Sequence, residues 1–187
     1  MIKRVFDILL AFFSILAFGF PMILIALAVK LTSKGPAVYW SDRMGLNNCI
    51  FKMPKFRTMT IETPALATRL MQNPEFYLTP IGFSLRKYSL DELPQLYSVL
   101  KGDISFVGPR PVLIDEQDLI KLRTAKGIYE ILPGITGWAQ INGRDDLTIP
   151  QKVAFEEDYL KNKSIFFDIK ILLITLIKVI KSENVSH

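Results

Sequence analysis

Two adjacent carboxylates, Asp91 and Glu92, are the residues of this chain whose type and spacing most suggest chemistry. Apolar residues follow them at helical spacing and predict a helix with one buried face: Leu93, Leu96, Tyr97 and Leu100. Pro94 fits only the first turn of that helix, because a proline placed deeper in the helix would remove a backbone hydrogen bond. We therefore favour Asp91 as the N-cap. The alternative is a capping box from Ser89 to Glu92, which places Pro94 a turn too deep.

Either N-cap places both carboxylates at the positive end of the helix dipole, where negative charge is favoured. The sequence therefore predicts that Asp91 stays ionised near neutral pH, as a nucleophile or a metal ligand would require. The alternative is that Asp91 only caps the helix, which is the commoner role of an acidic residue at a helix start. The rest of the chain is what favours a chemical role.

The single cysteine and the single histidine restrict this chemistry. His187 is the last residue, so Ser-His-Asp and Cys-His arrangements and histidine-rich zinc sites are disfavoured. Cys49 cannot form an internal disulfide, which indicates a reducing compartment, and without an evident base we interpret it as inert. Acid, base or nucleophilic chemistry therefore falls to carboxylates, lysine, tyrosine or the lone thiol.

Basic residues give the chain a formal net charge of +5 and a pI near 9.3. This balance suits nucleic acid, an anionic membrane surface or a phosphorylated substrate, without choosing among them. Lys52, Lys55 and Arg57 form a basic cluster, which is either a phosphate cradle or the solvated face of a strand. Arg110 stands between two prolines that stiffen its backbone, which suits a guanidinium aimed at an oxyanion. The alternative is a rigid connector.

An apolar N-terminal stretch predicts a membrane segment over residues 1–34. Residues 8–29 carry no charge and are long enough to cross a bilayer. Pro21 lies within this run, so two interpretations stay open: a kinked spanning helix, or a re-entrant hairpin that turns back at Pro21. Basic residues flank both ends of the run: Lys3, Arg4, Lys30 and Lys34. Since basic residues prefer the cytoplasmic side, these flanks favour the hairpin.

The rest of the chain predicts an α+β, mostly helical fold, with residues 35–187 as a compact cytosolic domain. Residues 37–40 and 50–55 predict a β-hairpin, and helices are expected over 64–71, 80–86, 113–125 and 151–162. We expect the acidic residues of the last helix to be solvated: Glu156, Glu157 and Asp158. Residues 132–144, rich in Gly, predict a functional loop in which Trp138 offers a stacking plane.

Residues 165–181 predict an amphipathic helix. Its polar residues fall roughly on one face: Asp168, Thr175, Lys178 and Lys181. Such a helix can lie in the membrane interface with its lysines at the lipid headgroups. The alternative is a core helix of the globular part.

Taken together, these blocks resemble one known family, the bacterial sugar transferases, or monotopic phosphoglycosyl transferases. The matching blocks, in chain order, are residues 3–7, 55–59, 86, 89–95, 100–103, 107–111, 133–140 and 142–144. Several blocks in the right order are more specific than any single motif, and the short chain resembles the minimal catalytic form of the family.

This resemblance implies an enzyme at the cytoplasmic face of the bacterial inner membrane. Such enzymes move a sugar 1-phosphate from a UDP-sugar to undecaprenyl phosphate through a covalent enzyme intermediate, release UMP and need Mg²⁺. The implied partners are both substrates and the lipid bilayer, with no nucleic acid; a homodimer stays open.

The resemblance also implies roles for individual residues. Asp91 matches the nucleophile and a metal ligand, and Glu92 matches its catalytic partner. The remaining implied positions bind the substrate: Lys55, Arg86 and Arg110 at its phosphates, and Arg144 at the uridine. The family's membrane segment is re-entrant and broken at a Ser-Pro pair, which implies a break at Pro21.

Two positions depart from the family pattern. Phe20 replaces the serine before Pro21, so the hydroxyl that could cap the broken backbone is missing. Ser41 stands where many members have a glutamine, two residues before Arg43. Two other functions remain as alternatives: a metal-dependent hydrolase of nucleotide or lipid diphosphates, and a non-catalytic membrane adaptor in which Asp91 is only a cap.

Overall fold

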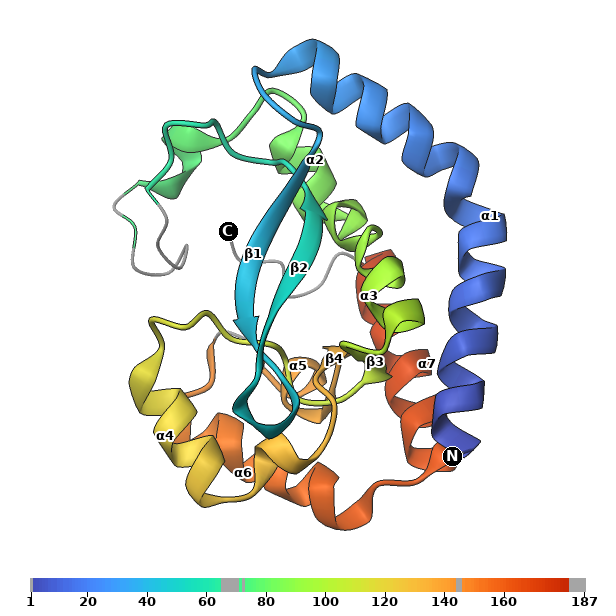
Figure 1. Cartoon of the computed structure of the whole chain (residues 1–187), viewed down its shortest axis with the longest axis vertical. Coiled ribbons are helices and arrows are strands. Elements are labelled where there is room, and N and C mark those ends of the chain that lie inside the picture. Colours follow the sequence, from blue (N-terminus) through green and yellow to red (C-terminus); the bar gives the residue numbers. More distant parts are fainter. Residues whose placement is uncertain (1, 65–70, 72, 144–145, 182–187) are drawn as a thin grey trace.

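The computed structural model describes residues 2–64, 71, 73–143 and 146–181. A long helix, α1 (Ile2–Thr32), runs along one side of the molecule, and the other elements lie to one side of it (Figure 1). The predicted helix over 64–71 falls almost wholly outside the described residues, and so does Arg144.

Helix α1 is continuous through Pro21, whereas the sequence predicted a helix, a break and a second helix. A proline removes one hydrogen bond and bends a helix, while the turns on either side keep their own bonds. The axis of α1 accordingly changes direction along its length (Figure 1). The helix is long and apolar enough to cross a membrane. Its middle leaves large apolar side chains exposed, among them Phe12, Phe13, Leu16 and Phe20.

Both ends of α1 contact the rest of the protein. Near the N-terminus, Arg4 donates to the carbonyls of Val99 at 2.5 Å and Leu100 at 2.7 Å. Near the C-terminal end of α1, Val29 is buried in a cluster with Phe56 and Leu85. The exposed apolar stretch of α1 is therefore held at two points on one body.

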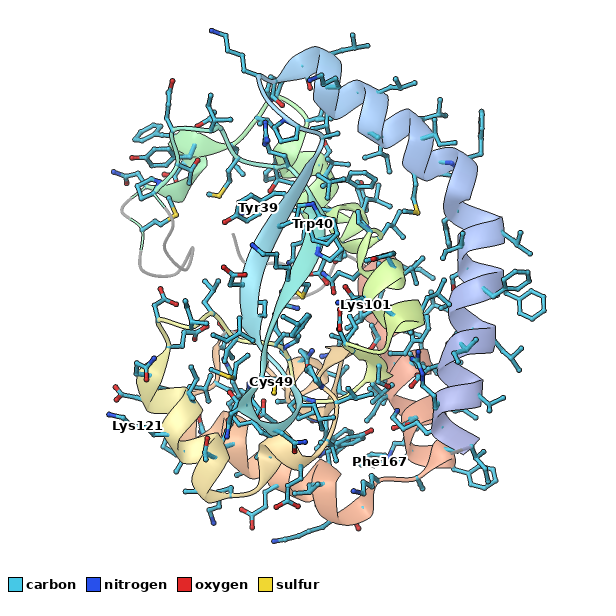
Figure 2. All side chains as sticks on the ribbon, in the orientation of Figure 1. Tyr39, Trp40, Cys49, Lys101, Lys121 and Phe167 are labelled. Atoms are coloured by element: carbon cyan, nitrogen blue, oxygen red, sulfur yellow. The ribbon has the colours of Figure 1, made fainter. Side chains whose placement is uncertain are left out.

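Strands β1 (Val38–Met44) and β2 (Ile50–Phe56) form the predicted antiparallel hairpin, with Val38 opposite Phe56 and Met44 opposite Ile50. The first strand is longer than predicted. Cys49 lies exposed just before β2, at the turn of this hairpin (Figure 2). A second, two-stranded sheet pairs β3 (Ser105–Val107) with β4 (Gly134–Thr136) in parallel.

The segment around Asp91 differs from the predicted helix start. Helix α2 (Gly82–Lys87) is followed by a 3₁₀ turn, η4 (Leu90–Glu92), and helix α3 (Gln95–Lys101) begins only after Pro94. Neither proposed N-cap is therefore correct. A 3₁₀ turn has three residues per turn, which rotates the following side chains relative to one continuous α-helix. Leu96 and Val99 are buried, while Tyr97 and Leu100 are exposed.

The C-terminal part packs helices around the second sheet. Its elements are α4 (Gln117–Ala125), η5 (Ile128–Glu130), α5 (Trp138–Ile141), α6 (Ile149–Asn162) and α7 (Ile165–Lys181). Two further 3₁₀ turns lie earlier in the chain: η1 (Leu46–Asn48) and η3 (Pro74–Tyr77). Helix α6 begins with a capping box between Thr148 and Gln151. Glu156 on α6 is buried against Arg123, so its predicted solvation was wrong.

Helix α7 turns three of its polar residues toward the protein. Asp168 is buried, the hydroxyl of Thr175 lies 2.7 Å from that of Thr136, and Lys178 donates to the carbonyl of Ile141 at 2.7 Å. The exposed residues of α7 are mostly apolar and are joined by Lys170 and Lys181; the apolar ones are Phe166, Ile169, Leu173, Leu176, Ile177 and Ile180. The expectation that Lys178 reaches the headgroups was wrong, because a backbone carbonyl satisfies it within the protein.

Candidate functional site

Three predicted site residues meet at one carboxylate oxygen. Oε1 of Glu92, in η4, accepts a hydrogen bond from Nζ of Lys55 at 2.7 Å and from Nη2 of Arg110 at 3.0 Å. Lys55 comes from strand β2, and Arg110 follows strand β3. Charge-assisted hydrogen bonds are stronger than neutral ones, so Glu92 holds both cations close to the 3₁₀ turn.

Asp91 is almost fully buried beside this cluster, with 7% of its surface exposed. Among the described residues, no donor is hydrogen-bonded to its carboxylate. Burial raises the pKa of Asp91, and so does the charge of Glu92, whereas Lys55, Arg86 and Arg110 act in the opposite direction. The helix dipole expected at Asp91 is missing, because no α-helix begins there, so burial and the neighbouring charges set the direction of this pKa shift.

Arg86 reaches the same region from the last turn of α2. Its Nε donates to Oγ1 of Thr58 at 3.0 Å, and Thr58 is itself buried. Burial lowers the pKa of Arg86, while the charge of Asp91 opposes that shift. Burial likewise lowers the pKa of Lys55, with Glu92 opposing. Asp91 is therefore enclosed by cations that are themselves partly desolvated.

Ser89 has a backbone conformation that sequence reasoning missed. Its φ of 53° lies in the left-handed region, which residues other than glycine and asparagine rarely adopt. Such strain is found disproportionately at functional sites, because only the surrounding structure can maintain it. Here it lies immediately before the turn that carries Asp91 and Glu92.

Glycines bring the Arg110 loop against strand β4. A Cβ on Gly134 would lie 2.1 Å from the nitrogen of Gly108, and a Cβ on Gly137 would lie 2.1 Å from the carbonyl oxygen of Gly108. These glycines therefore serve close packing of backbone on backbone, where the sequence suggested room for a ligand.

Trp138 is also used inside the protein. Its ring packs edge-on against Phe167, with 4.9 Å between the ring centroids, and Lys170 lies over it at 5.6 Å. The predicted stacking plane for a ligand is thus occupied by residues of α7.

A cavity of about 380 Å³ opens beside Glu92 and Arg110. It lies between α1, α3, the second sheet and α7, and most of its lining is apolar: Phe18, Leu93, Leu96, Phe106, Leu172 and Leu176. Its volume is within the range of small-molecule sites, about 300–1,000 Å³. Apolar walls with a few polar groups at one side suit a ligand that has a hydrocarbon part and a charged head.

Asp91 is the carboxylate of the described site that could hold a metal ion, because Glu92 is engaged by Lys55 and Arg110. No group of three or more His, Cys, Asp or Glu side chains is found among those residues. Mg²⁺ is usually held by only one or two carboxylates together with substrate phosphates. Asp91 therefore fits a magnesium ion that arrives with a phosphorylated substrate.

The family model described as "Bacterial sugar transferase" matches residues 1–182. The chain belongs to this family. Among relatives of this sugar transferase, the uncharacterized sugar transferase EpsL of Bacillus subtilis is 41% identical over 187 residues, which are 100% of this chain and 91% of EpsL.

Two relatives of the sugar transferase have more informative names. The exopolysaccharide production protein ExoY of Rhizobium meliloti is 38% identical, with 94% of this chain and 84% of ExoY aligned. The UDP-glucose:undecaprenyl-phosphate glucose-1-phosphate transferase of Escherichia coli is 40% identical over 95% of this chain. The chain spans only 40% of that longer protein.

Proposed function

We propose that this sugar transferase moves a sugar 1-phosphate from a UDP-sugar to undecaprenyl phosphate through a phosphosugar ester of Asp91. Membership of the family and the reaction named for the Escherichia coli relative support the general transfer. The observation that carries the covalent step is the buried carboxylate of Asp91, enclosed by the charges of Lys55, Arg86 and Arg110. Phosphoryl transfer needs this combination of a positioned nucleophile and surrounding positive charge.

In the first half-reaction, a carboxylate oxygen of Asp91 attacks the phosphorus that carries the sugar. The new bond joins this oxygen to phosphorus, and the bond from that phosphorus to the bridging oxygen of the diphosphate breaks. UMP leaves with the electron pair as a phosphate anion, so no proton transfer is required. Lys55 and Arg110 would then exchange part of their interaction with Glu92 for the phosphate oxygens, where negative charge gathers.

In the second half-reaction, a phosphate oxygen of undecaprenyl phosphate attacks the same phosphorus. The bond to the Asp91 oxygen breaks, the carboxylate returns, and the product is a lipid-linked diphosphate sugar. The cavity beside Glu92 and Arg110 supports this order, because its apolar walls suit the start of the lipid chain while Arg110 faces the headgroup. Glu92, the neighbour of Asp91 in the chain, lines this cavity.

A magnesium ion fits beside Asp91 when the diphosphate is bound, and it would supply charge neutralisation at the diphosphate oxygens. The chain's own cations act on the same oxygens: Arg86 from the side of α2, Lys55 from the hairpin, and Arg110 from the loop after β3. Partial burial of these groups strengthens their electrostatic effect on the phosphate.

We further propose that α1 enters the cytoplasmic leaflet and returns, as a bent re-entrant helix. Contacts of both its ends with one globular body support this arrangement, as does the exposed apolar middle (Figure 2). A straight spanning helix would instead carry its ends to opposite sides of a bilayer core about 30 Å thick. The exposed apolar face of α7 would then rest on the same leaflet.

The transfer is tested by incubating the purified protein with Mg²⁺ and a panel of UDP-sugars, starting with UDP-glucose. UMP release without acceptor, together with a mass increase of one phosphosugar on the intact chain, is the expected result. The Asp91→Asn variant should show neither. Free sugar phosphate with no lipid product, when undecaprenyl phosphate is present, would instead identify a hydrolase.

A further inference from the structure

The backbone that carries Arg110 is anchored through three consecutive carbonyl groups. Pro109 and Pro111 have no N–H, so carbonyls are the main groups by which this segment can be anchored. The carbonyl of Pro109 accepts from the nitrogen of Gly134 at 2.9 Å. The next two carbonyls accept from arginine side chains: that of Arg110 from Arg123 Nη1 at 2.9 Å, and that of Pro111 from Arg43 Nη1 at 3.3 Å.

Arg123 is the more deeply buried of these two donors, with 1% of its surface exposed. Its guanidinium is oriented by Glu156, which is 2% exposed. Nε donates to Oε2 at 2.8 Å, and Nη2 donates to Oε1. This two-pronged pairing fixes the plane of the guanidinium, so that Nη1 points at the Arg110 carbonyl. Helices α4 and α6 are thereby connected to the loop of the site.

A buried ion pair is a costly way to join two helices. Desolvation of two charges often outweighs their attraction, and apolar residues of similar size hold helices together equally well. An aliphatic pair, however, could not donate to the Arg110 carbonyl. The directed third contact is what distinguishes Arg123 and Glu156 from a simple α4–α6 bond.

Arg43 anchors the neighbouring carbonyl in a similar way. Its Nε donates to the hydroxyl of Ser41 at 3.1 Å, and Ser41 is buried between the strands of the hairpin. The hydroxyl of Ser41 thus orients the guanidinium of Arg43. The hairpin and the α4–α6 pair therefore hold the segment from two directions.

We propose that Arg123, oriented by Glu156, is a positioning residue for Arg110: it fixes the Arg110 peptide and so directs that guanidinium toward the phosphates of the UDP-sugar. This inference rests on the proposed function. It assigns a role to a side chain that lies under the loop and touches no substrate. Without the Arg123 contact, the Arg110 peptide can rotate, and its guanidinium no longer meets the phosphate in a fixed place.

A double-mutant cycle tests this role. Arg123→Gln should lower kcat/KM for UMP release by about 10- to 100-fold, since a misplacement of about 1 Å costs on the order of 100-fold. The same change made in an Arg110→Gln background should have less than about a twofold further effect, because the residue that Arg123 positions is already gone. If the double variant loses kcat/KM by the product of the two single losses, the proposal is overturned.

Matched variants separate positioning from folding. Lys126→Gln removes a surface ion pair with Glu157, 3.2 Å long, that joins the end of α4 to α6, and it should leave kcat/KM unchanged. Arg123→Lys keeps a positive charge for Glu156 but loses the bidentate geometry of the guanidinium. Its thermal midpoint should therefore fall less than that of Arg123→Gln, while its activity should still be lost. If Arg123→Lys keeps full activity, the positioning role is wrong.

The readouts also distinguish this inference from the proposed function. If the wild-type protein releases no UMP from any UDP-sugar, the transfer itself is wrong. An active wild type with multiplicative losses in the cycle leaves the transfer intact and removes only the role of Arg123.

Discussion

Glu92 and Lys55 form an ion pair with 2.7 Å between Oε1 and Nζ, and Arg110 shares the same carboxylate oxygen. Two cations predicted to bind phosphate are thus held by an internal anion. A phosphorylated ligand must compete with Glu92 for them, which couples donor binding to movement of the Glu92 side chain.

Glu92→Gln should therefore tighten binding of UDP. The amide keeps the size of the side chain but no longer neutralises Lys55 and Arg110, and a gain of about 1.4 kcal/mol corresponds to tenfold in Kd. Isothermal titration calorimetry at fixed salt measures this directly. Arg110→Gln is the opposite change and should weaken the same binding; UDP affinity that is equal in both variants would contradict the competition.

Asp91→Asn should abolish the covalent intermediate and also stabilise the protein. Burial raises the folded-state pKa of Asp91, so the stability it contributes is fully present below its unfolded pKa and is lost as pH rises through the folded pKa. At neutral pH the ionised side chain thus destabilises the fold. Single stabilising changes commonly yield about 0.5–2 kcal/mol, which for a chain of this size is roughly 1–8 °C in thermal midpoint.

The thermal comparison has an internal check. The stabilisation by Asp91→Asn should shrink as pH is lowered, because the wild-type carboxyl then becomes protonated and resembles the amide. A difference in midpoint that grows on acidification would have the wrong sign for a raised pKa.

The rate of UMP release should have two pH limits. Asp91 must be ionised to attack, and its raised pKa places the acid limit above the ordinary aspartate value of about 3.9. Lys55 must be protonated to bind phosphate, and its lowered pKa places the basic limit below the ordinary lysine value of about 10.4. Lys55→Arg should move the basic limit upward, since a guanidinium stays charged. A basic limit unchanged by Lys55→Arg would exclude Lys55 as its origin.

The outward face of α7 should lie in lipid. In a Cys49→Ser background, a fluorescent label on Leu173→Cys should be quenched by spin-labelled lipids, whereas one on Lys121→Cys of α4 should not. Lys121 extends away from the body of the protein (Figure 2). Equal quenching at both positions would argue against a membrane face on α7. Tags at Met1 and His187 should both be accessible from the cytoplasm, and accessibility from opposite sides would indicate a spanning helix.

Local patterns predicted the elements of this fold well. The hairpin, α2, α6 and α7 follow from apolar runs, turns and caps that lie within each segment. Strands β3 and β4 escaped prediction because each has three residues, too few for an alternating pattern, and their partners are distant in sequence. The start of α3 was misplaced because a 3₁₀ turn and an α-helix have similar sequence signals.

Features that depend on distant partners could not be predicted from the sequence. Glu156 was expected in water because its own helix has a polar pattern there, and only the packing of α4 reveals Arg123 beside it. The polar face of α7 was correctly recognised, but its direction depends on acceptors such as the Ile141 carbonyl. For the site, family motifs brought Lys55, Glu92 and Arg110 into one hypothesis, and the structure brings these three together.

Lys3 and Asp168, 165 residues apart, are joined by a contact of 2.6 Å, and Asp168 also accepts from the hydroxyl of Tyr159 at 2.7 Å. During synthesis the apolar helix leaves the ribosome long before its partner on α7 exists. The contact that holds the start of α1 against α7 therefore cannot form until the last helix is made. Assembly of the site is in this sense a late event of biogenesis, and truncation of α7 should trap the protein as a membrane-bound, immature chain.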